Sequence, residues 1–256
     1  MTNYFVDTHC HIFKSDYENI DEVLKNASNN HIKYIINNGS NNEFNKEVLD
    51  LIEKYPNMYG AIGIHPEDVD DATQEDIKFI EDNLSNEKIV AIGEIGLDYY
   101  YTKDNKEEQI KLFETQLALA EKYNLPVIVH SRDATEDTIN SLKKFNCKGV
   151  IHSFSGSLET ARIYIKMGYL LGVNGVITFK NAKIKEVIKD VGLENILLET
   201  DSPYLTPEPF RGKQNNPGHV FEIAKFVADL YNISLEELAK KTNKNIAIMY
   251  KKMKLD

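Results

Sequence analysis

The chain has 256 residues, of which 42% are hydrophobic and 27% are charged. This composition predicts a globular protein with a sizeable core and excludes an intrinsically disordered one. The formal net charge of -10 argues against broad electrostatic attachment to nucleic acids or anionic membranes, so local cations would have to hold any phosphate-bearing substrate.

The sequence has no targeting or membrane-spanning pattern. Its first residues lack the basic segment and the apolar run of a secretory signal, and no apolar run approaches the roughly 18 residues of a membrane span. Cys10 and Cys147 are too few for a disulfide framework and are typical of a reducing compartment. We therefore predict a cytoplasmic protein, and we expect a monomer because no strong interface pattern stands out.

Short apolar segments alternate with segments of helical periodicity. The predicted strands cover residues 4–11, 32–36, 58–64, 88–93, 125–129, 148–151, 169–173 and 195–198. The predicted helices cover residues 17–30, 44–52, 73–84, 106–123, 135–145, 158–167, 184–191, 220–231 and 235–251. Thr73, with Asp76 three residues later, is predicted to cap the third of these helices.

The predicted strands are rich in Ile, Val and Leu and alternate little, which is typical of parallel strands buried on both faces. Eight strand–helix units in about 250 residues predict an α/β fold, a (β/α)8 TIM barrel that forms a single domain over residues 1–256. A doubly wound open sheet is the alternative, because it has the same alternation of strands and helices.

Histidines and carboxylates follow the predicted strands at the ends where the active site of such a barrel lies. His9 and His11 point to the same face of the first strand, since side chains alternate along a strand. The later strand ends carry His65, Glu94, His130, His152 and Asp201. Each of these has an ordinary explanation alone, such as a solvated acid or a turn residue, but together they favour a metal site. His31 and His219 lie elsewhere and are interpreted as surface or loop residues.

Four imidazoles and two carboxylates exceed the needs of one tetrahedral ion and fit two divalent ions about 3.5–4 Å apart. We predict that Glu94 bridges the ions. One ion would bind His9, His11, Glu94 and Asp201, and the other would bind Glu94, His130 and His152. This donor set accepts Mg, Mn or Zn, and also Fe or Ni, so it does not single out one metal.

Three further carboxylate roles follow from this arrangement. The ions would acidify a water molecule as the nucleophile, and Asp201 is placed to accept its proton. Asp7 and Glu199 share faces with the ligands and are predicted to orient them as hydrogen-bond acceptors.

Several segments resemble the motifs of the TatD-type metal-dependent deoxyribonucleases of the amidohydrolase superfamily. They are DTHCH at 7–11, GIHP at 63–66, GEIGLDY at 93–99, PVIVHSR at 126–132, HSFSG at 152–156, ETDSPYL at 199–205 and PFRGK at 209–213. The resemblance covers nearly the whole chain and implies that the metals bind to the same residues as above, namely His9, His11, Glu94, His130, His152 and Asp201.

The resemblance also implies hydrolysis of DNA phosphodiester bonds, in some members as a 3′-to-5′ exonuclease that prefers single strands. We therefore predict a deoxyribonuclease that acts on single-stranded DNA ends through a water activated by two metals. Glu94, Asp201 and His65 are its predicted catalytic residues. His65 has no place in either ligand set and is assigned to the substrate phosphate or the leaving group.

Substrate contacts are predicted at Arg132, Arg211 and Tyr204. Arg132 would clamp a phosphate oxygen, or else pair with the acids that follow it. Arg211 lies in a loop rich in Pro and Gly that would close over the site, or else is plain surface charge. The tyrosines at 99–101 would stack on bases, or else serve packing or an interface.

Two other functions compete with the nuclease. Related barrel hydrolases cleave small amides, lactones or phosphoesters and often bridge their metals with a carboxylated lysine. Glu94 at the fourth strand favours the nuclease, whereas the acidic net charge favours a small substrate. The third interpretation is a non-catalytic, metal-bound scaffold that docks on other proteins and would keep its function when a ligand histidine is replaced.

Overall fold

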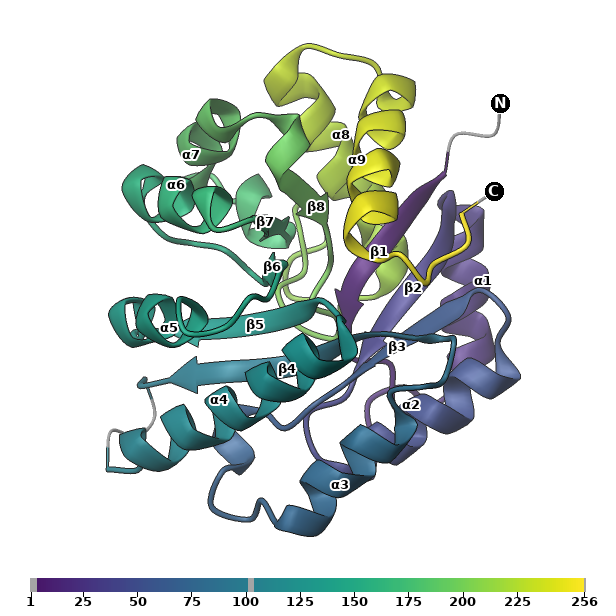
Figure 1. Cartoon of the computed structure of the whole chain (residues 1–256). Helices are drawn as coiled ribbons and strands as arrows, with labels where there is room; N and C mark the ends of the chain where they lie inside the picture. The colour runs from purple at the N-terminus through teal and green to yellow at the C-terminus, as the bar shows by residue number, and fades with distance from the viewer. Residues whose placement is uncertain (1–3, 101–103, 256) are drawn as a thin grey trace.

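The computed structural model describes residues 4–100 and 104–255. Its parallel strands form one eight-stranded sheet in the order β1 to β8 (Figure 1). The strands are β1 (Phe5–Cys10), β2 (Ile32–Asn38), β3 (Met58–Ile62), β4 (Ile89–Asp98), β5 (Val127–Arg132), β6 (Gly149–Ile151), β7 (Tyr169–Val173) and β8 (Ile196–Leu198).

The segment after β8 returns to β1 and closes the sheet. The amide of Asp201 donates to the His9 carbonyl at 2.9 Å, and the amide of His11 donates to the Ser202 carbonyl at 2.7 Å. Cys10 and Ser202 form a parallel bridge at the same place. The predicted barrel is therefore confirmed and the open sheet is wrong, and the residues that close the barrel flank candidate metal ligands.

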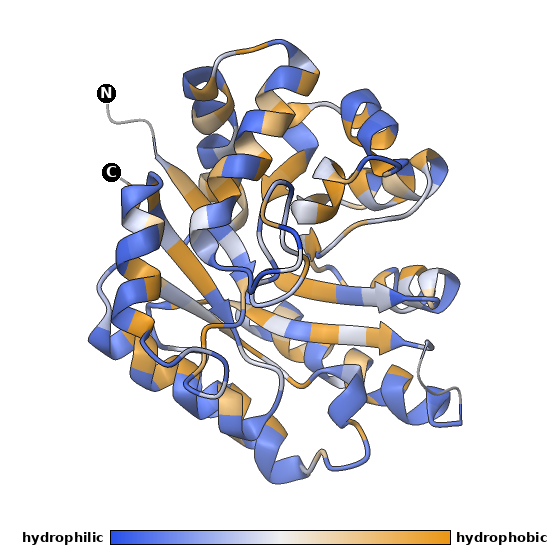
Figure 2. Cartoon of the chain, turned by 180° about the vertical axis from the view of Figure 1, so that it is seen from behind, coloured by the Kyte–Doolittle hydropathy of each residue, from blue (hydrophilic) through white to orange (hydrophobic). Residues whose placement is uncertain are grey.

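Helices surround the barrel (Figure 1). They are α1 (Ile20–Asn29), α2 (Asn42–Lys54), α3 (Gln74–Asn83), α4 (Lys106–Tyr123), α5 (Thr135–Leu142), α6 (Leu158–Lys166), α7 (Ile184–Val191), α8 (Val220–Tyr231) and α9 (Leu235–Met249). Figure 2 shows hydrophobic residues along the strands and many hydrophilic residues on the helices. The predicted cap of α3 is confirmed, because the Thr73 amide donates to Asp76 Oδ2 at 2.9 Å and the Asp76 amide donates to Thr73 Oγ1 at 3.2 Å. No helix within the described ranges is long and apolar enough to cross a membrane.

The interior of the barrel has its own hydrophobic cluster, separate from the one between strands and helices. It includes Ile128, Val150 and Leu197, which lie two residues before His130, His152 and Glu199 along their chain segments. Because every second residue of a strand faces the same side, this cluster forms the layer beneath those polar residues. Residues of α9 and the segment after it complete the cluster, namely Ile246, Met249, Tyr250 and Met253.

Glu94 lies within β4 and not at its end. The prediction that the fourth strand stops at Gly93 is wrong, because β4 continues to Asp98. Ile92 pairs with Val127 and Ile95 with Val129, so β4 has one extra residue over this stretch. Such a bulge redirects a side chain, and here it presents the buried carboxylate of Glu94 to the other candidate ligands.

Gly96 allows β4 to pass close to β5. Its φ is +151°, and a Cβ atom there would lie 2.0 Å from the His130 carbonyl oxygen. Gly96→Ala is therefore expected to lower the free energy of unfolding by about 2–4 kcal/mol, because both the backbone and its neighbour must shift. At Gly212, where φ is +86° and no atom lies within 4 Å of an added Cβ, alanine is expected to cost only about 1 kcal/mol. Urea unfolding of both variants measures the difference, and equal losses would contradict the argument.

Candidate metal centre

The predicted metal ligands come from separate strands and meet at one end of the barrel. A cavity of about 790 Å³ lies there, and the ligands that line it are His11, Glu94, His130, His152 and Asp201. His9 is fully buried next to them. The structure therefore brings together all six predicted ligands.

The first predicted ligand set has the spacing of a tetrahedral metal site. The Nε2 atoms of His9 and His11 lie 3.1 Å apart. Each of them lies 3.3–3.4 Å from Glu94 Oε2 and 3.6 Å from Asp201 Oδ1. Ligands at about 2.0–2.1 Å from one ion stand about 3.3–3.4 Å from each other in a tetrahedron. These four donors therefore fit a single ion.

The other oxygen of Glu94 faces the second predicted set. Oε1 lies 3.0 Å from His130 Nδ1 and 3.6 Å from His152 Nε2. Asp201 Oδ1 also comes within 3.7 Å of His152 Nε2. The two oxygens of one buried carboxylate thus point to different sets of donors, which is the arrangement that a bridge between two ions requires.

The outer ring nitrogens of His11 and His130 are held by hydrogen bonds. His11 Nδ1 donates to the Asn38 carbonyl at 2.9 Å, and His130 Nε2 donates to Asp98 Oδ2 at 2.8 Å. These bonds leave the lone pair of the inner nitrogen for a metal. The sequence did not single out Asp98. Asp98 lies four residues after Glu94, so a strand predicted to continue past Gly93 would have pointed to it.

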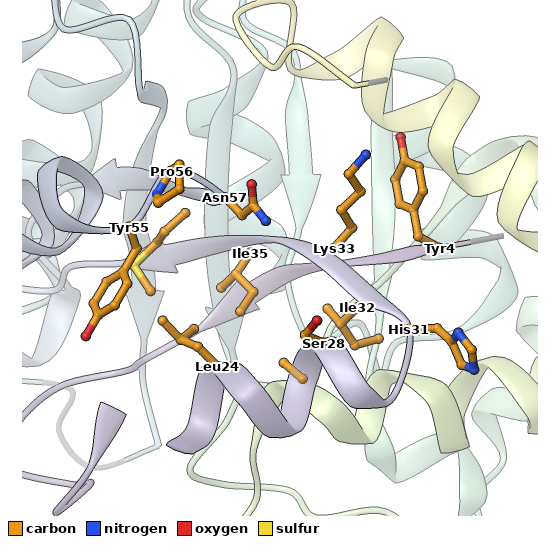
Figure 3. Close-up of a pocket in the computed structure, with 12 residues that line it drawn as sticks. Tyr4, Leu24, Ser28, His31, Ile32, Lys33, Ile35, Tyr55, Pro56 and Asn57 are labelled. Carbon is orange, nitrogen blue, oxygen red and sulfur yellow. The ribbon is translucent and has the colours of Figure 1, made fainter. Parts of the chain in front are cut away.

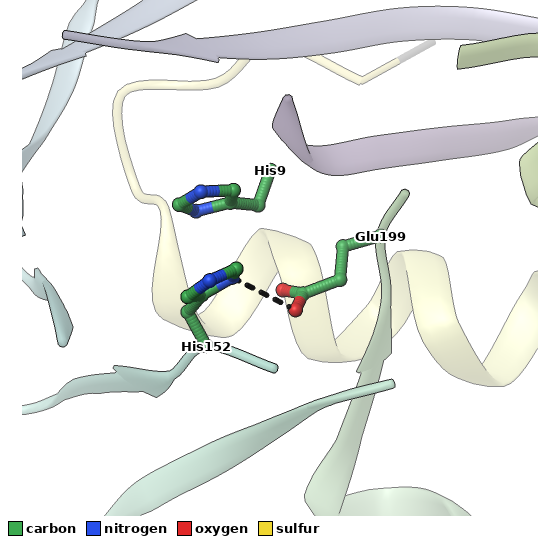
Figure 4. A group of neighbouring side chains, drawn as sticks. All are labelled: His9, His152 and Glu199. Carbon is green, nitrogen blue, oxygen red and sulfur yellow. Dashed lines mark hydrogen bonds and ion pairs between the residues drawn. The ribbon is translucent and has the colours of Figure 1, made fainter. Parts of the chain in front are cut away.

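His152 is held by Glu199, as predicted. Its Nδ1 donates to Glu199 Oε1 at 3.0 Å, and its ring stacks on that of His9 with the ring centres 3.7 Å apart (Figure 4). Asp7 acts differently from the prediction. It accepts the amides of His9 and Thr200 and the hydroxyl of Thr200, so it holds the chain beside His9, and its hydrogen bonds within the described residues include no ring nitrogen.

His65 lies at the same rim but has a different environment. Its Nδ1 accepts the amide of Glu67 at 3.2 Å, at the start of the short helix η1 (Pro66–Asp68). The proton is therefore on Nε2, which lies 3.7 Å from Glu94 Oε1. Burial, followed by the nearby charge of His130, lowers the pKa of His65 to about 3. The ring is neutral and offers one N–H group to the cavity.

Carboxylates and imidazoles in the cluster stabilise each other's charged forms. Burial lowers the pKa of His11 and His152, but Glu94 and Asp201 outweigh it and raise each to about 10. The pKa of His130 rises to about 9, against the effect of burial, because its hydrogen bonds go to carboxylates. Burial opposes ionisation of Glu94 and Asp201, yet the histidines lower the pKa of both. Divalent ions would replace the protons on these imidazoles, which is the charge balance expected of a metal site.

The predicted substrate contacts divide into two groups. Arg132 and Tyr204 line the cavity, and the side chain of Tyr204 is 60% exposed. The Arg132 guanidinium lies over the ring of Tyr100, 3.7 Å from its centre. Arg211 is not among the described residues that line the cavity and lies over the ring of Phe179, 4.2 Å from its centre.

The tyrosines at 99–101 do not act as one group. Tyr99 is buried and its hydroxyl donates to Asp137 at 2.9 Å, which confirms the packing alternative for this residue. Tyr100 is 57% exposed, and Tyr101 lies outside the described residues. The cavity also has acidic residues that the sequence did not single out, namely Asp16, Glu67 and Asp68.

A second cavity of about 630 Å³ lies beside α1 and the first residues of β2 and β3 (Figure 3). Much of its lining is aliphatic, as at Leu24 and Ile32, and the described lining contains no carboxylate. Lys33 lies over the ring of Tyr4, 4.9 Å from its centre. The exposed His31 also lines this cavity, so it lies away from the metal ligands, as predicted.

Comparison with known proteins confirms the resemblance seen in the motifs. The family model described as TatD related DNase matches residues 6–251. The metal-dependent hydrolase YabD of Bacillus subtilis is 41% identical over 250 residues, which cover 96% of this chain and 98% of YabD. The human protein named deoxyribonuclease TATDN3 is 30% identical over 264 residues, covering 97% of this chain and 95% of that protein.

A solved structure supports the same assignment. The crystal structure of YJJV, a TatD homolog from Escherichia coli K12, matches with a TM-score of 0.91 and 32% sequence identity, covering 98% of this chain and 99% of that one. Both the sequence and the fold thus agree over nearly the full length. The chain therefore belongs to the family of TatD-related DNases and is a metal-dependent hydrolase.

Proposed function

We propose that the chain hydrolyses phosphodiester bonds at the ends of single-stranded DNA, with two divalent ions held around Glu94. The observation that carries the proposal is the division of the two Glu94 oxygens between two sets of donors with metal-ligand spacing. The family and the name of its human member support DNA as the substrate.

The residues of the cluster would hold Mg, Mn or Zn ions in two sets. One set is His9, His11, Glu94 and Asp201, and the other is Glu94, His130 and His152. When bound, such ions acidify the attacking water and neutralise charge that develops on the phosphoryl group. The protein supplies the fixed geometry, because its ligands are buried and their outer atoms are hydrogen-bonded.

In this proposal Asp201 accepts a proton and His65 donates a hydrogen bond. Asp201 accepts the proton of the attacking water, since its side chain is 15% exposed, faces the cavity and is ionised at neutral pH. His65 donates its Nε2–H group to a phosphoryl oxygen or to the leaving oxygen. Its low pKa keeps the ring neutral, so it stabilises charge through a hydrogen bond and does not transfer a proton.

The cavity supports a strand end as the substrate. Its volume of about 790 Å³ is within the range of small-ligand sites. A cavity of this size is too small for a segment of duplex. Arg132 would bind the phosphate through charge-assisted hydrogen bonds, and the exposed ring of Tyr204 would stack on a base. Asp16, Glu67 and Asp68 would repel further phosphates, which also favours a short end over a long tract.

A small phosphoester is the second candidate substrate. The acidic residues of the cavity and the net charge of -10 favour it, because both oppose binding of a polyanion. A substrate with one phosphate would meet Arg132 and the metal ions without passing the acidic side of the cavity.

End-labelled DNA distinguishes the two candidates. We expect release of nucleotides from single-stranded DNA with added Mg, Mn or Zn, slower release from duplex, no release with a chelator, and earlier loss of a 3′ label than of a 5′ label. If metal-loaded protein leaves DNA intact but hydrolyses bis(p-nitrophenyl) phosphate, DNA is the wrong substrate class and the second candidate replaces it.

A further inference from the structure

A fully buried tyrosine lies beneath the proposed metal centre. Tyr250 directly follows α9, and its side chain belongs to the barrel interior together with Leu197 of β8. Figure 4 shows α9, the faint yellow helix, behind the cluster formed by His9, His152 and Glu199. Leu197 lies two residues before Glu199, on the same face of its chain segment. Burial, and after it the charge of Glu199, raises the pKa of Tyr250.

Three fully buried side chains of this region each have an atom without a hydrogen-bond partner among the described residues. These atoms are Tyr250 Oη, Glu199 Oε2 and His9 Nδ1. The other oxygen of Glu199 accepts two hydrogen bonds, one from His152 Nδ1 and one from the amide of Ser153. Buried polar atoms without partners are costly and rare in folded proteins, so a shared partner is the simplest way to satisfy all three.

We propose that one internal water joins Tyr250 Oη, Glu199 Oε2 and His9 Nδ1, and that Tyr250 is thereby a positioning residue for the metal ligands. A ring nitrogen of His9 and a carboxylate oxygen of Glu199 lie within 4.8 Å of each other. Two hydrogen bonds of about 2.8 Å through one water span such a separation. Internal waters commonly make about three hydrogen bonds to groups that otherwise lack partners.

The donors and acceptors of the three side chains match one shared water. The water accepts from the Tyr250 hydroxyl and from His9 Nδ1–H, and it donates to Glu199 Oε2. With its proton on Nδ1, His9 presents the lone pair of Nε2 to the first ligand set, 3.3 Å from Glu94 Oε2. His11, His130 and His152 have direct partners for their outer nitrogens, and the water would supply the equivalent partner for His9.

The proposal rests on the metal centre of the proposed function, and its test uses metal binding and not DNA cleavage. Tyr250→Phe removes the hydroxyl and keeps the ring. Tyr169→Phe is the matched control, because Tyr169 is also buried with a hydroxyl that lacks a partner within the described chain. Burial, and after it Cys147 and Tyr164, raises the pKa of Tyr169, and no metal ligand is among these causes. Affinity for Mn²⁺ is measured by titration calorimetry on metal-free protein, together with the Tm of the metal-free form and a high-resolution crystal structure.

We expect Tyr250→Phe to weaken Mn²⁺ binding about tenfold, since loss of a group that orients metal ligands typically has such an effect, and Tyr169→Phe to leave it within twofold. The wild-type crystal should contain the water, and the Tyr250→Phe crystal should lack it. Equal affinity in Tyr250→Phe and wild type, or an equal loss in both variants, would overturn the proposal. Absence of Mn²⁺ binding by the wild type would overturn the metal centre itself, whereas intact DNA with normal Mn²⁺ binding would affect only the proposed substrate.

Discussion

Glu94→Gln is expected to lower the rate of DNA hydrolysis by about a thousandfold or more and to reduce the number of Mn²⁺ ions bound per chain. Glutamine has the same size, but it is neutral and offers only one oxygen. In the wild type, one oxygen of Glu94 faces His9 and His11 and the other faces His130 and His152. The variant can serve only one of these sets. Losing a group that stabilises transition-state charge typically costs about 10²–10³ in rate, and loss of a bridging ligand adds to this because an ion is lost as well.

The Glu94→Gln result is interpreted against a matched exposed site. Glu159 lies on the surface of α6, outside the cavity, and Glu159→Gln makes the same chemical change there without an expected effect on rate or metal content. Calorimetry and metal analysis of dialysed protein give the number of bound ions, and end-labelled DNA gives the rate. If Glu94→Gln keeps both ions and more than a tenth of the activity, Glu94 does not bridge the metals.

Much of the fold was predictable because its signals are local. The alternation of apolar strands with amphipathic helices indicated a parallel barrel, and side-chain alternation placed His9 and His11 on one face. The strand ends then indicated where the ligands meet. The same information could not reveal the bulge in β4, because a bulge depends on pairing with β5 and not on the residues of β4 alone.

The hydrogen-bond partners of the ligands were harder to predict than the ligands. Glu199 was recognised because it lies two residues before Asp201 on the same segment. Asp98 was missed because the predicted strand ended too early, and Tyr250, which is proposed to reach Glu199 through a water, is far from it in sequence. Such contacts depend on the closed barrel, in which α9 covers one end of the interior and the metal ligands lie at the other.

The metal-free chain is expected to lose stability as the pH rises from about 6.5 to about 10. His11 and His152 have pKa values near 10 in the folded chain and His130 near 9, compared with 6.5 as the ordinary value. Because their protonated forms are favoured by folding, their contribution to stability is fully present below pH 6.5 and is lost as the pH passes 9–10. The lowered pKa values of Glu94 and Asp201 have the opposite sign, so their contribution is lost in acid.

Metal affinity should rise with pH, whereas the stability of the metal-free chain should fall. Each proton that an ion displaces makes its apparent affinity rise about tenfold per pH unit below the pKa of that group. In the first set only His11 is protonated at neutral pH, since burial lowers the pKa of His9, whereas the second set contains both His130 and His152. We therefore expect about a tenfold gain per pH unit for the first ion and about a hundredfold gain for the second. Titrations with Mn²⁺ at pH 6, 7 and 8, combined with Tm measurements of the metal-free form, test both slopes. A metal-free Tm that rises between pH 7 and 9, or affinities that do not change with pH, would mean that the imidazoles are not the protonated partners of Glu94 and Asp201.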